Sequence, residues 1–149
     1  MGSRRKSREL AMQALFYMDM RQDDSDEILY RFCDNFTPPN KATPFFFRLV
    51  KGVIRAKSDI DAIIERFSDN WKLTRMSCVD RNIIRIAAYE LICCQDIPPK
   101  VSINEAIDVG KKFGAEKSGA FINGILDSIH LAIKKEDINI QVNIQANET

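Results

Sequence analysis

Residues 101–127 of this chain read VSINEAIDVGKKFGAEKSGAFINGILD. Apolar residues recur every three or four positions in the first half, and Ser102 with Glu105 has the spacing of a capping box at a helix start. Gly114 follows the last apolar residue, at a place where glycine commonly ends a helix. The same periodicity begins again at Ser118. The stretch therefore predicts two helices joined by a tight corner.

Helical periodicity extends through the rest of the chain. Residues 77–94 form the longest helical pattern, and the wide apolar stripe predicts a central helix. Further helices are expected over 7–20 and after three residues whose hydroxyls can cap a helix, namely Ser25, Thr43 and Ser58. Gly124 lies inside the last predicted helix, where glycine costs about 1 kcal/mol relative to alanine. Close helix packing is therefore expected at Gly124.

Length and composition fit one domain with a full core, since the chain has 149 residues, of which 45% are hydrophobic and 29% charged. We expect an all-α fold, a compact bundle of about seven helices in two helical subdomains that meet near Trp71. The domain spans 1–136 and includes a basic N-terminal arm, 1–9. The tail, 137–149, alternates apolar and polar residues as a strand does, but a lone strand has no partner in a helical domain. A flexible tail and pairing with the tail of another chain both stay open.

The chain lacks the patterns of the common catalytic and metal sites. Its four cysteines and single histidine, His130, have no zinc-site spacing, and its glycines match neither the phosphate loop nor the dinucleotide fingerprint. No apolar run approaches the roughly 18–20 residues of a membrane span, and no apolar segment of a secretory signal follows the charged N-terminus. We expect a reduced, cytoplasmic binding protein rather than an enzyme, with no cofactor, no metal and no membrane contact.

Charge and aromatic residues suggest the partner. The formal net charge is only +1, but four basic residues lie within the first ten positions, namely Arg4, Arg5, Lys6 and Arg8. Arginine suits phosphate recognition. Phe16 lies on the same helix, and Phe121 lies in the first turn of the last helix, near Lys111 and Lys117. Aromatic rings among basic side chains are typical of contacts with single-stranded RNA, although a core position for Phe121 stays open.

The helix over 7–20 is apolar on two sides. Met12, Phe16 and Met20 lie opposite its main apolar stripe. Such a helix is either sandwiched between others or exposes a contact surface. These three residues are therefore candidates for contact with a protein partner.

Three segments carry a resemblance to a known family: RRKSRELAMQALF at 4–16, RIAAYEL at 85–91, and the block at 101–127. In order and spacing, residues 4–133 resemble the NusB family of transcription antitermination factors. The resemblance implies an all-helical fold of two subdomains that binds the boxA segment of rRNA leader transcripts. It also implies NusE, a small-subunit ribosomal protein, as a partner, and a complex that joins RNA polymerase and other Nus factors to suppress termination.

Carried over residue by residue, the resemblance implies an RNA surface made of Arg4, Arg5, Lys6, Arg8, Phe16, Arg85, Lys111, Glu116, Lys117, Ser118 and Phe121. Phe16 stands where the family often has tyrosine, so the ring is kept and the hydroxyl lost. Lys117 stands where an acidic residue can occur, which makes this corner more basic. Two alternatives stay open: an accessory protein of rRNA maturation or ribosome assembly that uses the same surface, and a protein–protein adaptor that binds no RNA. The oligomeric state, including a homodimer, also stays open.

Overall fold

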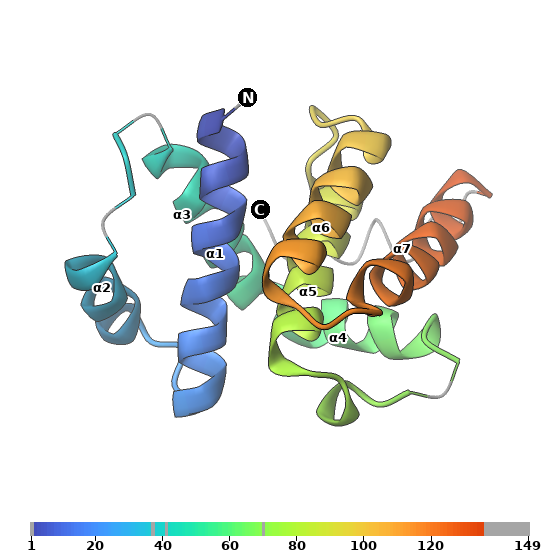
Figure 1. Ribbon diagram of the computed structural model, residues 1–149, viewed down its shortest axis with the longest axis horizontal. Helices are drawn as coiled ribbons and strands as arrows, with labels where there is room; N and C mark the ends of the chain where they lie inside the picture. Colours follow the sequence, from blue (N-terminus) through green and yellow to red (C-terminus); the bar gives the residue numbers. More distant parts are fainter. Residues whose placement is uncertain (1, 37, 41, 70, 136–149) are drawn as a thin grey trace.

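The computed structural model describes residues 2–36, 38–40, 42–69 and 71–135, and these residues form seven α-helices and one short 3-10 helix (Figure 1). The helices are α1 (Gly2–Arg21), α2 (Asp26–Asn35), α3 (Thr43–Arg55), α4 (Lys57–Arg66), α5 (Cys78–Cys93), α6 (Pro99–Phe113) and α7 (Ser118–Lys134), with the 3-10 helix η1 (Leu73–Arg75) before α5. The all-α class with about seven helices is thereby confirmed. The strand-like tail, 137–149, lies outside the described residues.

Two helices begin with a serine cap, and the sequence predicts the one at Ser25 but not the one at Ser77. The Ser25 hydroxyl accepts a hydrogen bond from the Ile28 N–H at 3.4 Å, and the Ser77 hydroxyl accepts one from the Asp80 N–H at 3.0 Å. Each bond satisfies one of the N–H groups that a helix start leaves without a partner. The starts of α2 and α5 are therefore set by local sequence.

The other predicted caps are wrong. Thr43 is the first residue of α3 rather than its cap, and α4 begins one residue before Ser58. Ser102 lies inside α6, which begins at Pro99, because proline fits the first turn of a helix and has no N–H to leave unpaired. The Ser102 hydroxyl is buried and donates to the Glu90 carboxylate at 2.8 Å. Ser102 therefore joins α6 to α5 rather than capping α6.

The helices form two halves, α1–α3 and α4–α7, that meet along α1, α3 and α5. In Figure 1, α1 stands between α2 and α3 on one side and α5 and α6 on the other. The halves divide at Ala56, between α3 and α4, rather than near Trp71, which lies inside the second half. The predicted central helix is confirmed, since α5 packs against α1, α3, α4, α6 and α7.

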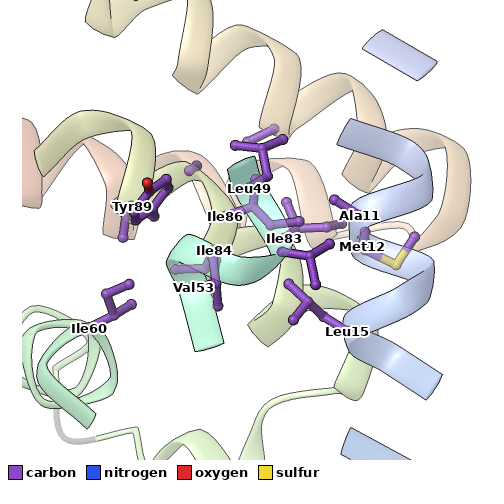
Figure 2. Close-up of a cluster of buried hydrophobic side chains, with 14 of the residues drawn as sticks. Ala11, Met12, Leu15, Leu49, Val53, Ile60, Ile83, Ile84, Ile86 and Tyr89 are labelled. Carbon is purple, nitrogen blue, oxygen red and sulfur yellow. The ribbon is translucent and has the colours of Figure 1, made fainter. Parts of the chain in front are cut away.

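Apolar side chains of the two halves interlock at their junction. Figure 2 shows side chains of α1 and α3 among those of α5, including Ala11, Leu15, Leu49, Val53, Ile83, Ile84 and Ile86. Each fully buried leucine or isoleucine side chain contributes about 1.5–3 kcal/mol of transfer free energy. A Cβ at Gly52 would overlap the ring of Tyr89, so glycine lets α3 and α5 approach closely.

The expectation of close packing at Gly124 is wrong. A Cβ at this position would meet nothing within 4 Å. The close approach between α6 and α7 lies instead at Gly110, where a Cβ would be 2.6 Å from the Ile122 Cδ1 atom. Both glycines lie within helices, and only the tertiary structure distinguishes the packed position from the open one.

Candidate nucleic-acid interface

The basic residues near the N-terminus lie on α1, which begins at Gly2, so they form the first turns of a helix rather than a separate arm. Arg4, Arg5 and Lys6 are exposed. The Arg4 guanidinium lies over the Phe45 ring, 4.4 Å from its centre, in a cation–π contact. Three of the four predicted basic residues are therefore accessible from outside the protein.

Arg8, the fourth basic residue, is buried. Its guanidinium donates two hydrogen bonds of 2.9 Å to the Glu90 carboxylate and one of 3.1 Å to Glu105. The side chains of Arg8 and Glu90 are only 5% and 1% exposed. An ion pair so deeply buried must stay paired, because removal of one partner leaves a charge in the protein interior. We therefore assign Arg8 a structural role, in holding α1 against α5.

Arg5 continues this network toward the surface. It donates to Glu105 and, at 2.7 Å, to Asp108 on α6. The hydrogen bond and charge of Glu105 raise the pKa of Arg5, and the hydrogen bond from Arg5 is the main cause that lowers the pKa of Glu105. About half of the Arg5 side chain stays exposed, so the guanidinium contacts the carboxylates of α6 on one side and the solvent on the other.

Arg85, on α5, is also buried and paired. It donates to the Asp61 carboxylate at 2.8 and 3.0 Å and to Asp19 at 3.1 Å. Burial would raise the pKa of Asp19, but hydrogen bonds from Arg81 and Asn82 and the charge of Arg85 outweigh burial and lower this pKa to about 2. We assign Arg85 a structural role, joining α1, α4 and α5.

The corner between α6 and α7 brings together most of the remaining predicted residues. Lys111, Glu116 and Lys117 are exposed, and Phe121 is half-buried in the first turn of α7. The carbon atoms of the Lys111 side chain lie about 3.5 Å from the position that a Cβ would take at Gly119, so this lysine lies along the start of α7. The corner thus presents two lysines beside an aromatic ring.

Ser118 shapes this corner from inside. It is buried, and its hydroxyl accepts a hydrogen bond from the Ala115 N–H at 2.8 Å. Gly114 ends α6 in an extended conformation, and a Cβ there would overlap Ser118. The predicted helix end at Gly114 is confirmed, and Ser118 fixes the turn rather than presenting its hydroxyl to a ligand.

Ion pairs align α1 with α6 and so indicate the level of Phe16 along α6. Arg5 contacts Asp108, and one turn further along each helix the Lys112 ammonium lies 3.1 Å from the Glu9 carboxylate. The two helices therefore run parallel, as Figure 1 shows. Phe16 is two turns beyond Glu9, which brings this half-buried ring to the level of the α6–α7 corner.

The expected contact surface on α1 is wrong for Met12. This side chain is only 2% exposed, and it lies among residues of α5, such as Ile83 (Figure 2), and of α6, such as Ala106. The helix is sandwiched, which is the other arrangement that its two apolar sides allow. Met20 is exposed near the end of α1, and Phe16 is accessible in part.

Two features of this region have no signal in the sequence. Lys112 pairs with Glu9, and Trp71, in the loop after α4, contacts Phe121 with the two ring centres 6.2 Å apart. No periodicity marks a loop residue, so only the folded structure places Trp71 at this corner.

Within the described residues, no cluster of three histidine, cysteine or acidic side chains could hold a metal ion, and no helix is long and apolar enough to cross a membrane.

Comparisons with known proteins agree over nearly the whole chain. The model of the NusB family matches residues 5–131. The transcription antitermination protein NusB of Desulfatibacillum aliphaticivorans is 58% identical over 137 residues, which cover 92% of this chain and 96% of the relative. The protein of the same name from Desulforapulum autotrophicum is 52% identical over 133 residues, 88% and 93% of the two chains.

Solved structures show the same fold. NusB of T. maritima has 42% identity and a TM-score of 0.77 over 86% of this chain and 90% of that chain. A crystal structure of antitermination factors NusB and NusE in complex with dsRNA contains a chain with 29% identity and a TM-score of 0.80, over 89% of this chain and 98% of that one.

Proposed function

Because this chain belongs to the NusB family, we propose that it is a transcription antitermination factor that acts in the cytoplasm. In this role it binds boxA-type RNA of rRNA leader transcripts together with NusE, and it joins the RNA polymerase complex with other Nus factors. The activity is one of binding. The observation that carries the proposal is the likeness, over 89% of this chain, to a protein solved in complex with NusE and dsRNA.

The surface chemistry supports RNA as the ligand. Phosphate contacts would come from Arg4, Arg5 and Lys6 on α1 and from Lys111 and Lys117 at the α6–α7 corner, while the rings of Phe16 and Phe121 offer stacking faces. Glu116 lies at the same corner, where its carboxylate can accept hydrogen bonds from bases. The ion pairs that align α1 with α6 support a single surface for these residues, with Met20 at the end of α1 as the apolar group open to a protein partner.

The central experiment titrates each component with the other present or absent. Fluorescence anisotropy of a labelled boxA RNA, with a scrambled RNA as control, gives the affinity with and without NusE. We expect NusE to raise boxA affinity at least tenfold, about 1.4 kcal/mol, and boxA to raise NusE affinity by the same factor, as linkage requires. Equal affinity for boxA and scrambled RNA, with no effect of NusE, would reject the proposal and favour the adaptor.

A matched pair of double variants locates the phosphate contacts. Each phosphate contact on a single strand contributes roughly 0.7 to the slope of log affinity against log salt. Replacing Lys111 and Lys117 by alanine should therefore reduce the slope by about 1.4. Replacing Lys134 and Lys135, exposed at the other end of α7, makes the same change of charge and should leave the slope unaltered. Equal effects of both pairs would show that only overall charge matters.

A further inference from the structure

A large aromatic side chain lies exposed beside Phe121. Trp71, the single tryptophan of the chain, is 51% exposed. Its ring meets that of Phe121 in a T-shaped arrangement, with centres 6.2 Å apart and planes at 69°. Tryptophan buries much apolar area when it is covered, so half-exposure beside a second ring leaves a surface that a ligand could cover.

The loop holds Trp71 in this exposed position. The Trp71 N–H donates to the Ser68 carbonyl at 3.0 Å, and the Ser68 hydroxyl donates back to the Trp71 carbonyl at 2.7 Å. Two residues later, the Leu73 N–H donates to the Glu65 carboxylate at 3.0 Å. Ser68 and Leu73 are buried. Trp71 is therefore bonded through its own backbone to the buried Ser68, and Leu73, two residues later, is bonded to Glu65, so hydrogen bonds hold the tryptophan in its exposed position.

Positive charge accompanies the two rings. The Phe121 N–H donates to the Lys117 carbonyl at 3.1 Å, so Lys117 lies one helical turn before Phe121 on the same face of α7. Lys72 follows Trp71 directly and is exposed. An apolar partner protein gains nothing from these cations, whereas a polyanion with flat bases matches both the charge and the rings.

We propose that Trp71 and Phe121 together form a stacking platform for the bases of single-stranded RNA. The proposal rests on the proposed function and adds Trp71 to the RNA surface. Because the planes of the two rings differ by 69°, two neighbouring bases cannot lie flat on both rings and remain stacked on each other. The platform therefore engages only a strand whose bases are splayed apart, and a duplex, whose bases stay paired and stacked, would be bound by other parts of the surface.

Trp71 provides its own assay, because no other residue of the chain contributes tryptophan emission. The wild-type protein is titrated with single-stranded boxA RNA and with an RNA duplex of the same length, to the same saturation by anisotropy. We expect the single strand to quench the emission and to protect Trp71 from acrylamide, and the duplex to do neither. Emission and acrylamide access that stay unchanged with saturating single strand would overturn the platform.

Substitutions test the energetic contribution. Stacking of one base contributes about 1–3 kcal/mol, so Trp71→Ala should weaken binding of single-stranded boxA RNA by roughly 5- to 150-fold. Trp71→Phe keeps an aromatic face and should retain most of the affinity. Tyr30→Ala is the matched control, because Tyr30 is 50% exposed on α2, in the other half of the protein. Its RNA affinity should equal that of the wild type.

The outcomes separate this inference from the proposed function. If the wild type binds no RNA, both fail. If it binds RNA and folded Trp71→Ala, checked by thermal melting, binds equally well, the platform is wrong and the proposed function stands. Loss of NusE affinity with unchanged RNA affinity would assign Trp71 to a protein contact and also overturn the platform. If Trp71→Ala fails to fold, the platform is tested by the RNA affinity of Trp71→Phe and by the quenching of tryptophan emission in the wild-type protein.

Discussion

Replacing Arg8 with alanine removes the cation that faces Glu90 between α1 and α5. Arg8 donates two bonds of 2.9 Å to a carboxylate that is only 1% exposed. Breaking a buried pair by deleting one partner costs about 3–5 kcal/mol. Ser102 still donates to Glu90 after the change, so we expect a loss near the lower bound, about 3 kcal/mol.

Urea denaturation followed by circular dichroism at 222 nm measures this loss. With a denaturant slope of about 2 kcal/mol/M, the midpoint for Arg8→Ala should fall by about 1.5 M. Lys6→Ala, an exposed control on the same helix, should shift stability by no more than about 0.5 kcal/mol. The double variant Arg8→Met with Glu90→Gln removes both charges and should recover at least half of the loss.

For RNA affinity we expect the opposite order: Lys6→Ala has the larger effect and Arg8→Ala the smaller one. At a temperature where both variants are folded, Lys6→Ala should weaken RNA binding more than Arg8→Ala does, because Lys6 is exposed and Arg8 is buried. A wild-type midpoint for Arg8→Ala, combined with an RNA defect equal to that of Lys6→Ala, would refute the structural assignment of Arg8.

Two further changes test other parts of the structure. Gly124→Ala should raise the unfolding free energy by up to about 1 kcal/mol, because a Cβ there meets open space. Gly52→Ala should lower the unfolding free energy, because its Cβ would overlap the Tyr89 ring. Thermal melting of both variants measures the difference. The pKa of Asp19 is lowered to about 2, so its ion pair stabilises the fold fully above about pH 4. This contribution to the unfolding free energy, about 2 kcal/mol, is lost as the pH falls through 2. Asp19→Asn should therefore flatten the loss of stability between pH 4 and pH 2, measured by urea midpoints across that range.

Helices and their order could be predicted because the information is local. Periodicity locates α5 and α7, and the hydroxyl of Ser25 marks a helix start that the structure confirms. The corner at Gly114 was likewise readable, since a glycine after the last apolar residue ends a helix in the sequence itself. The family resemblance of the block at 101–127 supplied the two-subdomain fold.

The roles of individual polar residues could not be predicted in the same way. Ser102 and Glu105 have capping-box spacing, but the same spacing places two side chains on one face of a helix, where both reach the buried network around Arg8. An arginine near a chain end is typical of an exposed phosphate contact, and the partner of Arg8 lies 82 residues away. One signal was present: Glu90 lies in the apolar stripe of 77–94, and a carboxylate on a buried stripe requires a cation.

The position of α1 between the two halves has a consequence for synthesis of the chain. The residues that complete its burial lie far downstream, with Glu90 82 residues after Arg8 and Lys112 103 residues after Glu9. At roughly 5–20 residues per second, the ribosome needs about 4–20 s to add them. During that time α1 has no α5 or α6 to cover Met12. The nascent α1–α3 segment therefore exposes apolar side chains that become buried only after α5 and α6 have been synthesised.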